Sequence, residues 1–166
     1  MPDQLNSISP LDGRYNKDAA VLSHYFSESA LMRYRIQIEV EYLIALSNEN
    51  KISALPQIPK ALQSTLRKLY EKFDSRSARR IKKIETQTNH DVKAIEQYNS
   101  EKLQKINLSK FIPWVHFGLT SEDVNNIAYS LMWQDAIKYV YLPKLNALQK
   151  IIMKLSRLYS SVSLLA

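Results

Sequence analysis

Residues 86–93, T-Q-T-N-H-D-V-K, decide how the rest of this chain is interpreted. Thr88 and Asn89 are short polar residues that can cap the N–H groups at a helix start, and Asp91 places an acid on the first turn. Apolar residues at helical spacing follow, so the stretch predicts a helix that begins beside His90. A helix start presents unpaired N–H donors and the positive end of the helix dipole, which both favour a bound anion.

A second stretch of the same kind lies further along the chain, at residues 116–123, H-F-G-L-T-S-E-D. Thr120 and Ser121 can cap this helix start, and Asp123 falls on its first turn. Two converging helix starts would make a receptor for a small polyanion. The alternative is that both sets of polar side chains are simply helix caps, which is their more frequent role.

The histidines in these stretches each have a structural alternative. A histidine at a helix start usually bonds a carbonyl or caps the end, and Asp91 can either fix the tautomer of His90 or act as a cap itself. Lys93 adds a positive charge near His90, or else lies in solvent on the first turn. His116 stands among apolar residues, where a packing role is more frequent than a catalytic one.

The start of the chain predicts an irregular arm over residues 1–18, with a turn at the Asp12-Gly13 pair. Such a turn would present the forked guanidinium of Arg14 and the ring of Tyr15 to a phosphate or carboxylate. The alternative is a capping tail that binds no ligand.

Helical patterns account for most of the remaining sequence. Residues 19–50 alternate in part like a strand, but their length and helix-favouring flanks predict one long helix that ends near 48–50. Further helices are expected with Pro59 as first residue, after a break at 74–75, after His90, after Ser121 and from Pro143. The last helix carries a regular apolar stripe that should not face water, so it needs partners absent from this sequence.

Composition excludes several classes of protein. No apolar run approaches the ~18 residues of a membrane span, no export signal is visible at the N-terminus, and no cysteine is present for a disulfide or a thiolate metal site. A cytoplasmic location is the expected one. With only two glycines, a glycine-rich phosphate loop is excluded, so side chains and helix ends must bind any phosphate.

The net charge of +7, from 23 basic and 16 acidic residues, suits an anionic metabolite and also raises the possibility of nucleic-acid binding. The one dense basic run covers residues 76–83, and acidic residues dilute the rest, which is typical of a solvated helix face. We expect neither nucleic-acid nor membrane partners. A basic helical nucleic-acid-binding module and a helical interaction module that docks through its last helix stay open as alternatives.

Three motifs occur in order: S-P-L-D-G-R-Y at residues 9–15, T-N-H-D-V-K at 88–93 and H-F-G-L-T-S-E-D-V-N-N at 116–126. Together they make the chain resemble the adenylosuccinate lyase family, in its longer bacterial branch within the fumarase and aspartase superfamily. The resemblance begins at about residue 7. It ends before the family's T-H-G-Q segment and its S-S-x-M-P-x-K-x-N-P loop, so the chain resembles the N-terminal portion of such an enzyme.

The resemblance implies an all-α fold, with an N-terminal helical domain over residues 1–119 and the start of a long central helix bundle over 120–166. It implies a lyase that cleaves adenylosuccinate to AMP and fumarate by β-elimination, and also the succinyl-aminoimidazole carboxamide ribotide of purine biosynthesis to its carboxamide and fumarate. No metal or organic cofactor is implied. A homotetramer with shared active sites is implied. Lyases acting on argininosuccinate or fumarate are the nearest enzymatic alternatives.

The resemblance also assigns roles to residues of this chain. Arg14 and Tyr15 would bind the nucleotide phosphate, Asn89, His90 and Asp91 would contact and orient the substrate, and Thr120 and Ser121 would bind a succinyl carboxylate. His116 and Lys93 are second-line candidates. The general acid and base are expected beyond Ala166, with an auxiliary chemical role for His90 left open. The 166 residues alone are therefore expected to be inactive.

Overall fold

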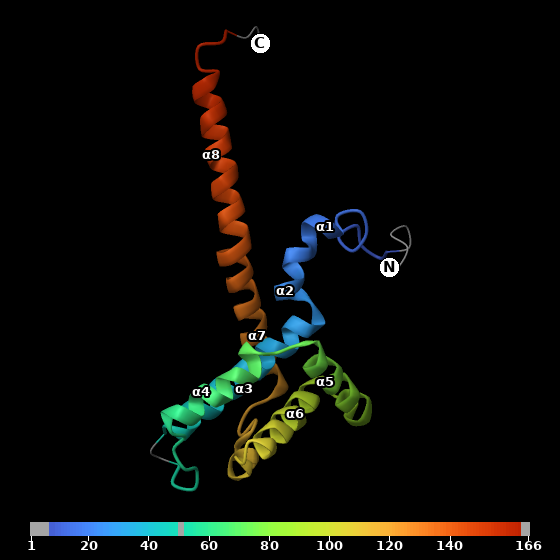
Figure 1. Ribbon diagram of the computed structural model, residues 1–166, viewed down its shortest axis with the longest axis vertical. Coiled ribbons are helices and arrows are strands. Elements are labelled where there is room, and N and C mark those ends of the chain that lie inside the picture. The colour runs from blue at the N-terminus through green and yellow to red at the C-terminus, as the bar shows by residue number, and fades with distance from the viewer. Residues whose placement is uncertain (1–6, 50–51, 164–166) are drawn as a thin grey trace. The chain divides into compact units, whose positions relative to one another are not determined.

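The computed structural model describes residues 7–49 and 52–163. Every regular element in these residues is helical, which confirms the all-α prediction (Figure 1). In chain order the elements are α1 (Asn16–Ala19), η2 (Ala20–Leu22), α2 (Ser23–Phe26), α3 (Glu28–Ser47), α4 (Lys60–Glu71), α5 (Ser75–Thr88), α6 (Asp91–Lys105), η3 (Ser109–Trp114), α7 (Ser121–Ala136), η4 (Ile137–Tyr141) and α8 (Leu142–Leu158).

The chain divides into two compact units. One unit is residues 26–132, and the other contains the described residues up to Tyr25 and from Trp133 onward. The domain boundary expected between 119 and 120 stays a prediction. The parts of the expected arm and of the expected bundle at residues 1–6 and 164–166 lie outside the described residues.

The single helix expected over residues 19–50 is wrong at its N-terminal end. Ser27 is extended, with φ −74° and ψ 160°, and its hydroxyl accepts the N–H of Ala30 at 3.1 Å. This cap starts α3 at Glu28, and the short helical segments α1, η2 and α2 precede it. At its other end α3 stops at Ser47, with Asn48 as its C-cap, and position 50 lies outside the described residues.

Helix α3 is the centre of the 26–132 unit, and it packs on several sides. It contacts α4, α5 and α6, and its Tyr34 and Ile36 are fully buried. The partly alternating sequence of α3 therefore reflects burial all round rather than a strand. One core lies between α3, α4, α5, α6 and η3, and includes Ile36, Leu66, Ile84, Ile95 and Phe111. A second core joins α3 to α7 and contains Tyr34, Ile38, Val124, Ala128 and Met132.

The helices after α3 begin close to their predicted positions. Pro59 is the N-cap of α4 rather than its first residue. Asp74 caps α5 by accepting the N–H of Ser77 at 2.8 Å. Between α6 and α7 lies the 3₁₀ segment η3, which includes Pro113.

The C-terminal helical run is continuous from α7 through α8, because the backbone at Ala136 and Leu142 is right-handed helical. Pro143 is the second residue of α8, close to the predicted start. A proline inside a helix lacks an N–H and excludes the carbonyl of residue i−4. The π-helical segment η4, which directly precedes α8, is the kind of local widening that accommodates this loss.

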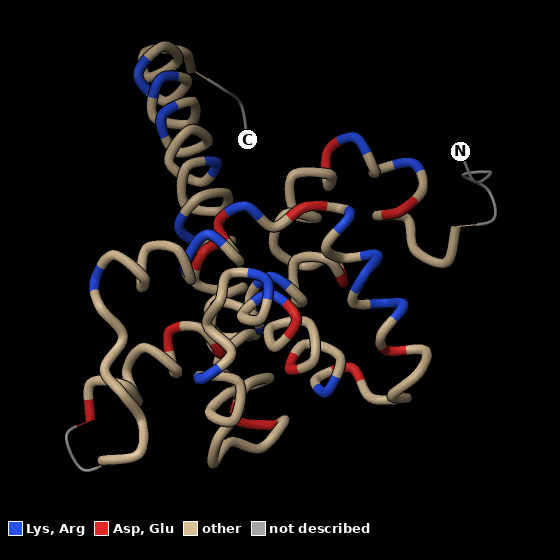
Figure 2. The backbone as a smooth tube through the Cα atoms, turned by 60° about the horizontal axis from the view of Figure 1, so that its bottom comes forward, with Lys and Arg blue, Asp and Glu red and all other residues tan. Residues whose placement is uncertain are grey.

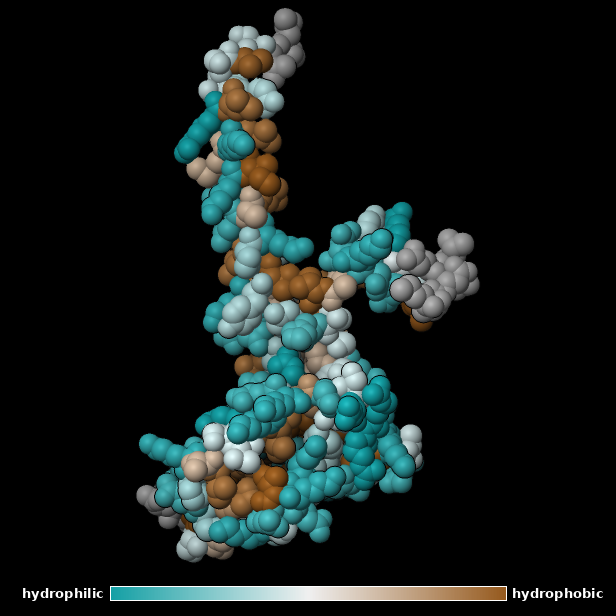
Figure 3. Space-filling model, in the orientation of Figure 1, coloured by the Kyte–Doolittle hydropathy of each residue, from teal (hydrophilic) through white to brown (hydrophobic). Residues whose placement is uncertain are grey.

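No side chain of α8 is buried. The expected apolar stripe is present along it, and Figure 3 shows apolar side chains along this helix. Its exposed members are Leu145, Leu148, Ile152, Leu155 and Tyr159. Across residues 7–49 and 52–163, no helix combines the length and the hydropathy needed to cross a lipid bilayer.

Candidate functional site

The N-cap of α6 is His90, not Thr88 or Asn89 as expected, and its ring makes the cap. The residue is extended, with φ −149° and ψ 117°, and its Nδ1 accepts the N–H of Lys93 at 3.2 Å. Since Nδ1 is an acceptor, the proton of the neutral imidazole lies on Nε2. The side chain is 51% exposed. His90 therefore offers an Nε2–H donor to a ligand at this helix start.

Asn89 makes the tight turn between α5 and α6. It adopts the left-handed conformation, with φ 50° and ψ 29°, and its N–H donates to the carbonyl of Glu85 at 2.8 Å. Asparagine tolerates this conformation better than most residues. The turn ends α5 directly before the His90 cap and leaves the Asn89 side chain exposed beside it.

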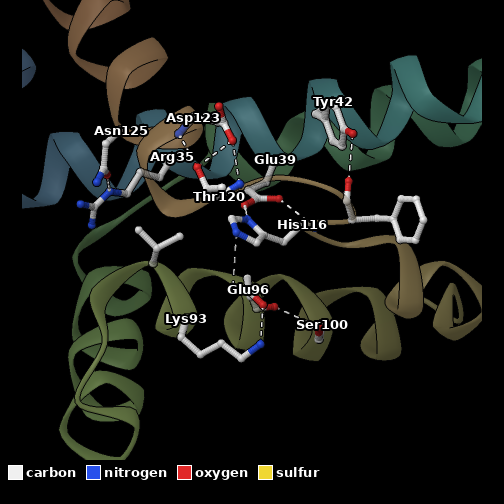
Figure 4. Close-up of polar contacts among 12 residues, drawn as sticks. Arg35, Glu39, Tyr42, Lys93, Glu96, Ser100, His116, Thr120, Asp123 and Asn125 are labelled. Carbon is white, nitrogen blue, oxygen red and sulfur yellow. Dashed lines mark hydrogen bonds and ion pairs between the residues drawn. The ribbon is translucent and has the colours of Figure 1, made fainter.

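Asp91, the first residue of α6, is bound by a buried arginine of α3. Arg35 Nη2 lies 2.6 Å from Asp91 Oδ2, and Arg35 Nε donates to Asn125 Oδ1 on α7 at 3.0 Å. Figure 4 shows the Arg35–Asn125 contact. Arg35 therefore ties the starts of α6 and α7 to α3. The Asp91 carboxylate lies 3.6 Å from His90 Nδ1, which already accepts from Lys93, so it does not set the tautomer of that ring.

The pKa of Asp91 reflects these contacts. Partial burial acts to raise it, but the N–H of Val92 and the positive charge of Arg35 outweigh burial. The pKa of Asp91 therefore lies below its ordinary value, and the carboxylate is ionised at neutral pH.

Thr120 and Asp123 cap the start of α7 reciprocally. The Thr120 N–H and hydroxyl each donate to Asp123 Oδ2 at 2.7 Å, and the Asp123 N–H lies 3.3 Å from Thr120 Oγ1. The bonds from the Thr120 N–H and hydroxyl lower the pKa of Asp123. The structure thus shows the capping role for Thr120. The hydroxyl of Ser121 bonds no other group in the described part of the chain, so it is available to a ligand.

His116 is held by Glu39, a buried residue of α3 (Figure 4). Its N–H donates to Glu39 Oε2 at 3.1 Å, and its Nδ1 lies 2.5 Å from Glu39 Oε1. On the other side, His116 Nε2 lies 3.8 Å from Glu96 Oε1 on α6. Burial raises the pKa of Glu39, although its hydrogen bonds to His116 oppose the rise.

Lys93 pairs with Glu96, not with a group near His90. Its Nζ lies 2.6 Å from Glu96 Oε2, so its charge is compensated within α6. Lys93 contributes to the His90 cap through its backbone N–H alone.

Arg14 and Tyr15 lie in the other unit. The expected turn is confirmed, since the N–H of Gly13 donates to the Ser9 carbonyl at 3.1 Å and that of Tyr15 to the Pro10 carbonyl at 3.0 Å. Both side chains are exposed. The Arg14 guanidinium lies 4.7 Å from the centre of the Tyr15 ring, an adjacent cation and aromatic ring.

The 26–132 unit thus contains Asn89, His90, Asp91, Lys93, His116, Thr120 and Ser121, and Glu96 lies between His116 and Lys93 but bonds only Lys93 of the two. Sequence reasoning missed Arg35 and Glu39. One signal was available, because these opposite charges lie at i and i+4 on one face of the helix. Within the described ranges, no three His, Asp or Glu side chains are grouped in a way that could hold a metal ion.

Two of the five cations in the basic run of α5 are paired with carboxylates. Arg80 pairs with Glu101, and Lys82 lies 2.7 Å from Glu28 and 2.9 Å from Glu85. Figure 2 shows basic and acidic residues interspersed along the chain. Such pairing disfavours a nucleic-acid interface, which needs uncompensated cations to neutralise phosphates.

Comparison with known proteins assigns this arrangement to a family. Residues 13–166 match the family described as Lyase, so the chain belongs to this lyase family. A protein named adenylosuccinate lyase from Legionella pneumophila (strain Corby) is 39% identical over 163 residues, which is 98% of this chain and 36% of the relative. A protein of the same name from Dictyostelium discoideum is 42% identical over 146 residues, which is 86% of this chain and 31% of the relative. Another from Escherichia coli is 37% identical over 163 residues, which is 98% of this chain and 36% of the relative. The chain spans about a third of the length of the curated relatives it matches.

Proposed function

We propose that the full-length polypeptide containing this chain is an adenylosuccinate lyase. It would cleave adenylosuccinate to AMP and fumarate, and the succinyl-aminoimidazole carboxamide ribotide to its carboxamide and fumarate. The observation that carries the proposal is the alignment of nearly the whole chain with relatives of this one name, at 37% to 42% identity. As part of the same proposal, the enzyme acts in the cytoplasm, where its nucleotide substrate is made.

β-Elimination of these substrates makes three chemical demands. A base removes the proton from the carbon next to a carboxylate, the C–N bond breaks, and an acid supplies a proton to the leaving nitrogen. Hydrogen-bond donors must also hold the charge that develops on the carboxylate side. We assign the hydrogen-bond donors to this chain, and the acid and base to segments beyond Ala166.

In this proposal the starts of α6 and α7 bind the succinyl part of the substrate. The Ser121 hydroxyl and the free N–H groups of the first turn of α7 hold a carboxylate. Thr120 assists only when its hydroxyl turns away from Asp123, so Ser121 has the larger part. His90 donates from Nε2, and the exposed amide of Asn89 contacts the substrate beside it.

In this proposal the N-terminal arm binds the nucleotide phosphate. Arg14 supplies a forked cation for phosphate oxygens, and Tyr15 supplies a ring and a hydroxyl next to it. Asp91 acts indirectly, because Arg35 holds its carboxylate and it in turn fixes the first residue of α6.

The exposed stripe of α8 supports assembly into a homo-oligomer. A soluble chain does not leave so long a row of apolar side chains in water, and a helix bundle formed with other copies would cover it. We propose a tetramer with shared sites, in which residues of this chain meet the acid and base of neighbouring copies.

The test is a substrate panel with the purified full-length polypeptide. Adenylosuccinate should release fumarate with a kcat/KM of at least about 10⁴ M⁻¹s⁻¹, whereas argininosuccinate should release none and fumarate should not be hydrated. Turnover of argininosuccinate alone would reassign the substrate. The 166-residue chain by itself should release no fumarate, and an enzyme-like rate from it would contradict the placement of the acid and base.

A thermal-shift series tests the binding residues. AMP and adenylosuccinate should raise the melting temperature of the wild-type full-length polypeptide, and His90→Ala or Arg14→Ala should reduce that rise. Lys17→Ala is the matched control, because it removes another exposed cation of the arm. An unchanged ligand-induced rise in both His90→Ala and Arg14→Ala would remove the site assignment.

A further inference from the structure

The loop before α7 is tied to α3 at two neighbouring points. His116 is bound by Glu39 through both its backbone N–H and its ring. The next residue, Phe117, accepts the hydroxyl of Tyr42 at its carbonyl, at 2.9 Å. His116 is held in the left-handed conformation, φ 59°, which a histidine adopts at a cost in free energy. Such strain persists where the surroundings fix it, and it is found disproportionately at functional sites.

The geometry of the Glu39 contact selects one form of the imidazole. A carboxylate has no proton to give, so both groups of His116 that face it must be donors. The backbone N–H donates to one carboxylate oxygen of Glu39, and an Nδ1–H donates to the other. The proton of the neutral ring is then on Nδ1, and Nε2 carries a lone pair. His90, whose Nδ1 is an acceptor, has the opposite tautomer.

In the described part of the chain, no group on the other side of the ring bonds to the Nε2 lone pair. The nearest carboxylate oxygen, on Glu96, is 3.8 Å from Nε2, beyond hydrogen-bond distance. The second oxygen of Glu96 is taken by Lys93 at 2.6 Å. The backbone of His116 lies close to the start of α7, since the N–H of Leu119 donates to the His116 carbonyl at 3.2 Å. Figure 4 draws the ring together with Thr120 and Asp123 of that helix start.

We propose that Glu39 is a positioning residue: it holds His116 as the Nδ1–H tautomer, so that Nε2 accepts a hydrogen bond from an N–H or O–H of the substrate bound at the start of α7. The role in turnover rests on the proposed function. The tautomer itself does not, so the two can fail separately. A buried carboxylate behind a histidine orients catalytic imidazoles elsewhere, and its amide replacement in the Ser-His-Asp triad traps the wrong tautomer at a cost of about 10⁴ in kcat.

The test compares Glu39→Gln with Tyr42→Phe in the full-length polypeptide. In Glu39→Gln the amide oxygen can still accept the His116 N–H, but the NH₂ group then faces Nδ1 and donates to it. The proton of the ring must move to Nε2. Tyr42→Phe removes the neighbouring anchor of the same loop and leaves the contact of the ring with Glu39 intact, so it serves as the matched control.

The direct readout is the ¹⁵N spectrum of histidine-labelled protein, recorded at about pH 8. His116→Gln identifies the signals of His116. The wild type and Tyr42→Phe should show a protonated Nδ1 and a bare Nε2, and Glu39→Gln should show the reverse. An Nε2–H ring in the wild type would overturn the proposal without any variant, as would an unchanged tautomer in folded Glu39→Gln.

The kinetic readout separates positioning from support of the loop. With adenylosuccinate, Glu39→Gln should lower kcat at least about 100-fold, with KM changed by less than about threefold, and Tyr42→Phe should leave kcat within about threefold of the wild type. Equal losses in both variants would show a merely structural role and overturn the proposal. If the full-length polypeptide does not turn over adenylosuccinate, the proposed function fails and the ¹⁵N spectra alone decide the role of Glu39.

Discussion

Replacement of Arg35 by methionine should loosen the starts of α6 and α7 together. Arg35 is 5% exposed and joins Asp91 on α6 to Asn125 on α7 through separate nitrogens. Methionine keeps a similar length and fills the apolar part of the site, so the change removes the hydrogen bonds with little loss of packing.

The magnitude follows from the two bonds. Both bonds are donated by the charged guanidinium of Arg35, and a hydrogen bond to a charged group contributes about 1.5–3 kcal/mol. The Asp91 side chain is 50% exposed, so water can replace Arg35 there and the lower end of the range applies. At about 1.5 kcal/mol each the sum is about 3 kcal/mol, from which partial rehydration leaves about 2 kcal/mol. This corresponds to about a 30-fold change in the equilibrium for local opening.

Hydrogen–deuterium exchange measured peptide by peptide can resolve this change in the full-length polypeptide. Peptides from α6 and α7 should exchange about 30-fold faster in Arg35→Met, while peptides from α4 should be unchanged. Arg67→Met is the control, because the partly buried Arg67 makes a two-pronged pair with Glu41 and bonds no residue of α6 or α7, so the change should leave α6 and α7 unaffected. Exchange in α6 and α7 within about twofold of the wild type would refute the reasoning.

Four further outcomes are expected. Asn99→Leu should raise the melting temperature and stabilise the fold by about 1 kcal/mol, since both side-chain polar atoms of this buried amide are without a partner in the described part of the chain; a lower melting temperature would contradict this. The pKa of Asp91 is lowered in the folded state, so its contribution to stability is present at neutral pH and is lost as pH falls below the ordinary carboxyl value of about 3.9 and through the lower folded value. The difference in melting temperature between wild type and Asp91→Asn should therefore shrink in acid, and a constant difference would count against it. Ser121→Ala should raise the KM for adenylosuccinate at least about tenfold with an unchanged melting temperature, and an unaltered KM would remove the carboxylate role. Leu148→Lys, on the exposed stripe of α8, should yield a smaller assembly by light scattering, and an intact oligomer would contradict the docking role of that stripe.

The starts of α5, α6 and α7 could be predicted because a helix cap is a local signal. A capping side chain bonds an N–H two or three residues away, so the sequence contains both partners. The side chains of Asp74, His90 and Thr120 all accept a backbone N–H in this way. The break at Ser27 is also a local cap, but the strongly helix-favouring residues on both sides hid it.

Arg35 and Glu39 could not be assigned from the sequence because their partners are distant along the chain. Arg35 bonds Asp91 and Asn125, and Glu39 bonds His116. Only the packing of α3 against α6 and α7 brings these side chains together. The sequence shows that Arg35 and Glu39 are charged residues of a helix, but it does not show what they bind.

The left-handed backbone of His116 is another feature that could not be assigned from the sequence. Nothing in H-F-G-L marks the histidine rather than Gly118 as a residue that needs positive φ, and the structure has both, with φ 59° and φ 72°. The contact with Glu39 makes this conformation favourable at His116. The sequence therefore identified the residue as a candidate, but the structure supplies the physical reason to connect it with function.

A crystal structure of the full-length assembly with AMP and fumarate bound is the most direct test of the central claim, that this chain binds the substrate while the acid and base come from other segments. We expect a fumarate carboxylate within hydrogen-bond distance of the Ser121 hydroxyl, the Nε2–H of His90 donating to a ligand, and Arg14 bound to the phosphate. The acid and base should come from residues beyond Ala166. Ligands that contact none of Arg14, His90 and Ser121 in any copy of the assembly would contradict the account.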